Sequence, residues 1–275
     1  MSEAVTTAAM TAPIAVTIAG SDSGGGAGIQ ADLKTFAALG VYGASVITAL
    51  TAQNTRGVTA VHDIPPVFVA AQIDAVFSDL DVRAVKIGML SQPQTIEAVA
   101  EGLARHGQTT VVLDPVMVAT SGDRLLAPPA VEVLRRVLVP RAVVITPNLP
   151  EAAALLEAPL AHSEAEMRAQ GERLLALGAR AVLIKGGHHA GPESVDILVE
   201  PTRMTRLAAS RVETSNTHGT GCTLSSAVAA GLAKGLDLTA AVRAAKDYVT
   251  AALGAAERLA VGSGHGPVHH FHAWW

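Results

Sequence analysis

The sequence has a single cysteine, Cys222, among its 275 residues. An intramolecular disulfide is therefore impossible, and a metal site built from several thiolates is excluded. A chain without disulfides suits a reducing compartment, so we expect a cytoplasmic protein. Aromatic residues make up only 3% of the chain, which disfavours the stacking platforms of proteins that bind single-stranded nucleic acid.

Charged residues are also scarce, at 16%, and the net charge of −4 comes without any basic tract. This pattern disfavours nucleic acid and anionic membranes as partners. No unbroken apolar run reaches the roughly 18 residues that a membrane-spanning helix needs. The N-terminal segment lacks the basic and apolar regions of a secretion signal. We expect residues 1–12 to form a disordered tail.

Hydrophobic residues, by contrast, make up 49% of the sequence, enough for a large core. Short apolar runs, typical of strands buried on both faces of a parallel sheet, occur at residues 14–19, 45–50, 84–87, 110–113, 142–145 and 181–184. Segments with helical spacing separate these runs, which predicts an α/β sandwich with a mostly parallel sheet. Residues 195–212 alternate in character and predict an antiparallel hairpin or edge. No linker divides the chain, so we expect one domain over residues 1–275.

A glycine-rich loop, GSDSGGGAG, lies at residues 20–28 between a predicted strand and a predicted helix. Its many glycines allow backbone to approach a ligand closely. The loop is not a Walker motif, because no Gly-Lys-Ser/Thr follows, and its glycine spacing does not match the dinucleotide fingerprint. The alternative to ligand contact is a flexible turn.

A second glycine-rich segment, NTHGTGCT at residues 216–223, precedes a run of small residues that predicts a helix. Amides from Gly219 to Cys222 would then lie at the helix N-terminus, where an anion such as a transferring phosphoryl group is favoured. A helix N-terminus also lowers the pKa of a thiol from about 8.5. The alternatives are a helix start that only packs tightly and a Cys222 that is an inert buried residue.

Polar residues follow several of the other predicted strands. Lys185 could reach a β- or γ-phosphate, unless it only extends to solvent at the rim of the sheet. Asn148 and Glu151, three residues apart at a predicted helix start, could hold a hydrated Mg²⁺, although Glu151 would also complement the helix dipole without a metal. Asp114 could orient the metal or its waters, and Gln53 offers a paired donor and acceptor.

The C-terminal segment, residues 265–275, contains four histidines and both tryptophans. No acidic residue or cysteine accompanies these histidines, which disfavours a catalytic metal site. We expect Trp274 and Trp275 to pack against the domain instead.

Together these segments resemble the hydroxymethylpyrimidine/phosphomethylpyrimidine kinases of thiamin biosynthesis, in the ribokinase superfamily. The resemblance covers residues 14–275, and its most specific parts are residues 19–32, 51–55, 86–90, 216–226 and 265–275. Many relatives carry a proline in place of Ser23. The resemblance implies a ribokinase-like three-layer sandwich, a homodimer, and ATP with Mg²⁺ as cofactors.

The resemblance also implies roles for individual residues. The pyrimidine site would comprise Gly20, Asp32, Gln53, Met89 and Val116. The phosphate and ATP site would comprise Asn148, Thr217, Gly219, Thr220 and Gly221, with the metal at Asp114 and Glu151. Cys222 takes the position of the aspartate base of sugar kinases, and Lys185 would stabilise the transferred phosphoryl group.

The implied reaction is the phosphorylation of 4-amino-5-hydroxymethyl-2-methylpyrimidine to its monophosphate and then its diphosphate. A pyridoxal kinase of the same superfamily is an alternative, which Gln53 and Met89 disfavour. A non-catalytic pyrimidine sensor is a second alternative, which Lys185 and Cys222 disfavour. A dinucleotide-dependent oxidoreductase is the least favoured alternative, because the glycine spacing does not match the fingerprint.

Overall fold

The computed structural model describes residues 12–118, 125–187 and 191–275. Almost all of the expected N-terminal tail therefore lies outside the described residues. Within them, one sheet has the strand order β3-β2-β1-β4-β5-β6-β7-β8-β9. The strands are β1 (Ile14–Asp22), β2 (Tyr42–Asn54), β3 (Gly57–Asp63), β4 (Val82–Ile87), β5 (Val111–Leu113), β6 (Val144–Ile145), β7 (Val182–Lys185), β8 (Glu193–Glu200) and β9 (Arg203–Ser210).

The six strands from β2 to β7 in this order run parallel, as the continuous apolar runs predicted. The predicted hairpin at residues 195–212 is confirmed as β8 and β9, which pair antiparallel at one end of the sheet. The strand β3 was not predicted. It pairs antiparallel with β2 at the other end, and most of its residues are exposed. An exposed edge strand lacks the continuous apolar run that marked the buried strands.

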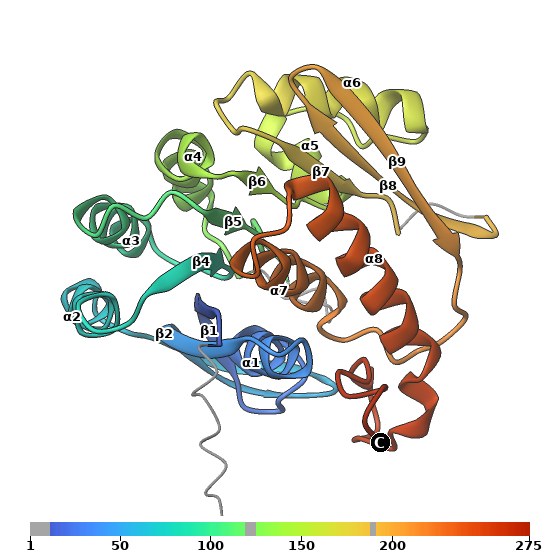
Figure 1. The fold of residues 1–275 in the computed structure, drawn as a ribbon, viewed down its shortest axis with the longest axis horizontal. Coiled ribbons are helices and arrows are strands. Elements are labelled where there is room, and N and C mark those ends of the chain that lie inside the picture. Colours follow the sequence, from blue (N-terminus) through green and yellow to red (C-terminus); the bar gives the residue numbers. More distant parts are fainter. Residues whose placement is uncertain (1–11, 119–124, 188–190) are drawn as a thin grey trace, which may run out of the picture.

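Helices cover both faces of the sheet and complete three layers (Figure 1). One face packs against α1 (Gly28–Ala38), α7 (Thr220–Ala233) and α8 (Leu238–Gly254). The other packs against α2 (Pro66–Phe77), α3 (Pro93–Arg105), α4 (Pro128–Val137), α5 (Leu149–Leu156) and α6 (Glu164–Leu175). Two short 3-10 helices are η1 (Val139–Arg141) and η2 (Ala256–Arg258). No helix in the described ranges is long and apolar enough to cross a membrane.

The helix α7 is buried along most of its length between the sheet and α8. Its small side chains make this close packing possible; at Gly231, a Cβ would contact Ala241 of α8 at 2.8 Å. Since a packed helix holds its ends in place, the N-terminus of α7 has a fixed position beside the carboxyl edge of the sheet. The predicted ligand loops gather at this same edge, because parallel strands end there.

Candidate functional site

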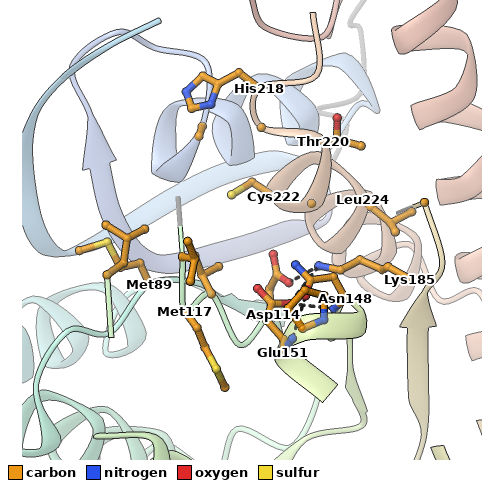
Figure 2. Close-up of a pocket in the computed structure, with 18 of the residues that line it drawn as sticks. Met89, Asp114, Met117, Asn148, Glu151, Lys185, His218, Thr220, Cys222 and Leu224 are labelled. Carbon is orange, nitrogen blue, oxygen red and sulfur yellow. Dashed lines mark hydrogen bonds and ion pairs between the residues drawn. The ribbon is translucent and has the colours of Figure 1, made fainter. Parts of the chain in front are cut away.

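A cavity of about 960 Å³ opens at the carboxyl edge of the sheet. Of the residues assigned to a site from the sequence, those that line it are Gly20, Gln53, Met89, Asp114, Val116, Asn148, Glu151, Lys185, Thr217, Gly219, Thr220, Gly221 and Cys222. Figure 2 shows Met89 and Met117 on one side of Cys222, with the cluster around Asp114 and Lys185 on the other. The cavity thus has an apolar end and a charged end.

The N-terminus of α7 lies between these two ends. Gly219 caps the helix with a left-handed backbone, φ +80°, and a Cβ there would collide with the carbonyl oxygen of Gly26 in the first glycine-rich loop. Only glycine therefore fits where the two loops meet. The amides of Gly221 and Cys222, in the first turn, have no acceptor within the helix. This arrangement can bind an anion.

At the charged end, Lys185 extends from β7 to the N-terminus of α7. Its Nζ lies 2.8 Å from Asp114 Oδ1 and 3.8 Å from Glu151 Oε2. A Cβ on Gly221 would lie 3.2 Å from the same nitrogen. Burial opposes ionisation of Asp114, but the Lys185 ammonium and the Thr146 hydroxyl hold its pKa below the usual value. A cation is therefore fixed beside the helix N-terminus, and both favour a phosphate.

Asn148 and Glu151 cap the helix α5 reciprocally. The Glu151 amide donates to Asn148 Oδ1 at 2.9 Å, and the Asn148 amide donates to Glu151 Oε2 at 2.8 Å. The predicted helix start is confirmed, and this pair forms the capping box. Burial raises the pKa of Glu151 to about 7; Asp114 adds to the rise and Lys185 opposes it. Among the described residues no cluster of three or more histidine, cysteine or acidic side chains is placed to hold a metal.

The apolar end is formed by the loops that follow β1, β2 and β4. Met89 packs over Gly20, where a Cβ would lie 3.3 Å from its sulfur. Gln53 accepts from the Thr51 hydroxyl at 2.9 Å, and its amide nitrogen lies 3.5 Å from His218 Nε2. A flat ring with polar substituents fits such a site, because thioether walls are adaptable and the amide offers both donor and acceptor.

Asp22 organises the glycine-rich loop, a role that sequence reasoning missed. Its carboxylate accepts from the amides of Gly24, Gly26 and Ala27 at 2.8–3.1 Å, and it lies 2.8 Å from His218 Nε2. Burial raises the pKa of Asp22, but these hydrogen bonds, led by that of His218, lower it overall. An aspartate two residues before a glycine is a typical Asx turn, so the sequence did contain this signal.

Ser23 joins the glycine-rich loop to the end of β2. Its hydroxyl donates to the Gln53 carbonyl at 2.8 Å and accepts from the Gln53 amide at 2.9 Å. Ser23 therefore fixes the backbone of Gln53, which lines the cavity.

Asp32 does not line the cavity, in contrast to the expectation that it contacts the substrate. Its side chain is fully buried and forms an ion pair with Lys86, also fully buried, at 2.8 Å. The sequence placed Asp32 in the correct helix but could not reveal which side of that helix faces the protein interior. Lys86, which sequence reasoning missed as a functional candidate, does line the cavity.

Cys222 lies on the cavity wall at the start of α7, as predicted. The expectation of a lowered thiol pKa is wrong, because burial raises the pKa of Cys222 to about 11. Lys86 opposes this rise, whereas Asp32 and Asp114 add to it. Desolvation therefore outweighs the helix terminus and favours the neutral thiol.

The C-terminal segment packs beside the site, but through its histidines rather than its tryptophans. His269 and His270 are buried, whereas Trp274 and Trp275 are 70% and 68% exposed, so the expected packing of the tryptophans is wrong. The His218 amide donates to the Gly266 carbonyl at 3.0 Å, and the Gly264 and His265 amides bond to Thr55. This segment therefore braces the loops after β2 and before α7.

Comparison with known proteins identifies the family of this chain. The model of a family described as phosphomethylpyrimidine kinase matches residues 22–269. A hydroxymethylpyrimidine/phosphomethylpyrimidine kinase of Rhizobium meliloti (strain 1021) is 64% identical over 262 residues, which cover 95% of this chain and 98% of that protein. The thiamine biosynthesis bifunctional protein ThiED of Geobacter sulfurreducens is 54% identical over 255 residues, which cover 93% of this chain and 51% of that protein.

Among solved structures, the ADP complex of Bacillus subtilis pyridoxal kinase has a TM-score of 0.89 to this chain. The two are 37% identical, and the match covers 96% of this chain and 99% of the other. The ribokinase-like fold that the sequence resemblance implied is thereby confirmed, and so is the resemblance to a kinase.

Proposed function

Since the chain belongs to the phosphomethylpyrimidine kinase family, we propose that it phosphorylates 4-amino-5-hydroxymethyl-2-methylpyrimidine twice in thiamin biosynthesis. The observation that carries the proposal is the position of the α7 N-terminus, between the apolar end of the cavity and the charged end, where Lys185 pairs with Asp114. An acceptor ring at Met89 and Gln53 would direct its hydroxymethyl group toward Cys222. The γ-phosphate of ATP would then lie at Gly219 to Gly221, beside Lys185.

Each part of the charged end has a task in this reaction. The α7 amides and Lys185 stabilise charge on the transferred group, which typically contributes roughly 10²–10³ in turnover per donor. Asp114 and Glu151 provide the oxygen ligands that Mg²⁺ prefers, and they lie against the same Lys185 ammonium. When bound with ATP, Mg²⁺ would neutralise phosphate charge. Asn148 and Thr217 complete the polar wall.

The two phosphorylation steps make different demands on Cys222. In the first, the hydroxymethyl oxygen bonds to the γ-phosphorus, ADP leaves with the electrons of the broken P–O bond, and the hydroxyl proton must go to a base. In a loose transition state this proton leaves late, so a weak base suffices. In the second, the acceptor is a phosphate anion with no hydroxyl proton to lose. A thiolate at Cys222 is useful only in the first step.

A second candidate function is pyridoxal phosphorylation. The likeness to a pyridoxal kinase supports it, because a pyridine ring with a hydroxymethyl group has a similar shape. A non-catalytic sensor is the less favoured alternative. The cavity contains both Lys185 and the N-terminus of α7, which can bind an anion. Binding of a pyrimidine alone would need neither.

The deciding experiment is mass detection of products from the purified protein with MgATP and the aminopyrimidine alcohol. We expect the monophosphate first and then the diphosphate, with pyridoxal turned over more slowly in a parallel reaction. The Lys185→Met variant is the matched control and should form neither product at a comparable rate. Faster turnover of pyridoxal would favour the second candidate, and no turnover of any ring would favour the sensor.

We also infer a cytoplasmic homodimer with a single domain per chain. Exposed apolar side chains gather on β2, β3 and α2, namely Tyr42, Leu50, Val61, Val67 and Phe68. Such a group of exposed apolar residues is typical of an interface, and the edge strand β3 would be covered by a second copy. Light scattering after gel filtration tests this, with Phe68→Asp expected to yield monomers.

A further inference from the structure

Lys86, at the wall of the cavity, forms an ion pair with Asp32, and neither side chain has any solvent-exposed surface. The Lys86 ammonium contacts both carboxylate oxygens, at 2.8 and 2.9 Å. Removing two charges from water costs several kcal/mol per ion, and apolar residues of similar volume are often equally stabilising. Stability alone therefore does not explain the pair.

The Asp32 carboxylate is fixed from three sides. Besides Lys86 on β4, it accepts from the hydroxyls of Thr17 on β1 and Ser226 on α7, each at 2.6 Å. Since Asp32 lies on α1, its contacts join four elements, namely α1, β1, β4 and α7. The carboxylate can hardly move, so the ammonium above it has a fixed position.

The spacing along two helices places this ion pair next to Cys222. On α7, Cys222 and Ser226 are four residues apart and share one face. On α1, Gly28 and Asp32 have the same spacing. The backbone of Gly28 lies close enough to lower the pKa of the Cys222 thiol, and the Ser226 hydroxyl donates to Asp32 at 2.6 Å. Ser226, which bonds to Asp32, therefore lies about one helical turn along α7 from Cys222.

Four charged groups act on Cys222. Asp32 on α1 and Asp114 on β5 disfavour a thiolate, Lys86 on β4 favours it, and Lys185 on β7 interacts with the thiol from the phosphate side. Lys86 is the largest of the influences that favour the thiolate. Lys185, paired with Asp114 at 2.8 Å as Lys86 is with Asp32, is the cation expected to engage phosphate.

We propose that Lys86 is a positioning residue for the first phosphorylation, a buried counter-charge that allows Cys222 to carry negative charge, with Asp32 holding the ammonium in place and limiting its effect. The role of Cys222 in this statement rests on the proposed function. The placement of the charge beside the thiol does not, and it can be measured without any substrate.

The experiment uses the fact that Cys222 is the chain's one cysteine, so alkylation by iodoacetamide reports on this thiol alone. The rate is followed by intact mass across a range of pH. Each unit of thiol pKa changes the thiolate fraction tenfold. We expect Lys86→Met to slow alkylation at a fixed pH by about tenfold or more, Asp32→Asn to accelerate it, and Lys86→Arg to retain most of the original rate.

These opposite directions separate the proposal from structural damage, which would expose the thiol and accelerate alkylation in both variants. Ser226→Ala is the matched control; it removes one bond to Asp32 without a change of charge and should leave the rate near that of the unchanged protein. If Lys86→Met unfolds, Lys86→Gln replaces it, with thermal unfolding as the check. An unchanged or faster rate in the folded Lys86→Met or Lys86→Gln variant would overturn the proposal.

Kinetics then connect the charge to the reaction. Lys86→Met should lower kcat of the first phosphorylation more than that of the second, with little change in KM. If the aminopyrimidine is not phosphorylated at all, the proposed function fails, but the alkylation result still decides whether Lys86 is the counter-charge of Cys222. Equal losses in both steps, with slower alkylation, would show that this charge does not act through Cys222 in catalysis and would overturn that part of the proposal.

Discussion

His218 Nε2 lies 2.8 Å from Asp22 Oδ2, although 196 residues separate them in the sequence. This contact joins the glycine-rich loop after β1 to the loop that leads into α7. The same Asp22 carboxylate accepts hydrogen bonds from three backbone amides of its own loop. One carboxylate therefore fixes the loop at the apolar end of the cavity relative to the loop that leads into the N-terminus of α7.

Asp22→Ala should weaken substrate binding. The variant leaves three amides and His218 without their acceptor, and each buried unsatisfied group costs about 1–3 kcal/mol. We expect KM for the aminopyrimidine to rise about tenfold or more, which corresponds to about 1.4 kcal/mol, with a lower Tm. Asp22→Asn retains one carbonyl acceptor, so its KM and Tm should lie between those of the unchanged protein and those of Asp22→Ala. Steady-state kinetics check this, and an unchanged KM in Asp22→Ala would contradict it.

Cys222→Ala should slow the first phosphorylation far more than the second, because only the hydroxymethyl group has a proton to lose. Single-turnover assays with the alcohol and with the monophosphate as separate substrates measure the two steps. Cys222→Ser is the control for packing, since it preserves the side-chain shape. Equal losses in both steps would assign Cys222 a purely structural role.

Lys246→Met should lower turnover although residue 246 lies on α8. Lys246 Nζ binds Asp196 at 2.8 Å, and the other oxygen of Asp196 accepts from the Gly186 amide at 3.0 Å, directly after Lys185. Without Lys246 the turn that carries Lys185 loosens, so we expect kcat to fall about tenfold, a loss of about 1.4 kcal/mol, with KM for the pyrimidine unchanged.

Breaking a buried ion pair also costs stability, typically about 3–5 kcal/mol. The double variant Lys246→Met with Asp196→Leu separates the two effects. It should regain much of the Tm but not the turnover, because Asp196→Leu also removes the acceptor of the Gly186 amide. Recovery of kcat in the double variant would show that the pair acts only through stability.

The fold was largely predictable from the sequence, because buried parallel strands have continuous apolar runs and their loops meet at one edge of the sheet. The positions of Lys185 and the α7 glycines followed from that rule. The contact between His218 and Asp22 could not be predicted, since it depends on how α1 and α7 pack together. The thiol pKa was predicted in the wrong direction because the sequence shows the helix start at Cys222 but not its burial.

Glu151→Gln should stabilise the protein at alkaline pH. The folded pKa of Glu151, about 7, lies above its ordinary value of 4.5. Its protonated form is favoured by folding, and the associated stability is present below pH 4.5 and is lost as pH rises through 7. Glutamine can still accept the Asn148 amide and needs no ionisation. The Tm difference between variant and parent should therefore grow between pH 5 and pH 8, and a constant difference would contradict this.

His270→Gln should reduce sensitivity to acid. Burial lowers the pKa of His270 to about 3, from an ordinary value of 6.5. The folded state therefore holds it neutral, and stability present above pH 6.5 is lost as pH falls toward 3. The loss between pH 7 and pH 5 should be about 2 kcal/mol. Glutamine can still accept from the Thr223 hydroxyl, which lies 3.1 Å from His270 Nε2. Urea unfolding at both pH values measures the difference.

Both tryptophans of the chain, Trp274 and Trp275, belong to the C-terminal segment that braces the loops at Thr55 and His218. The Trp275 ring contacts the ring of the buried His269 in a tilted arrangement, at a centroid distance of 4.7 Å. All tryptophan fluorescence of the protein therefore originates from this one segment. The molecule therefore contains its own optical reporter, and a change in the packing of Trp275 against His269 can be followed without any added dye.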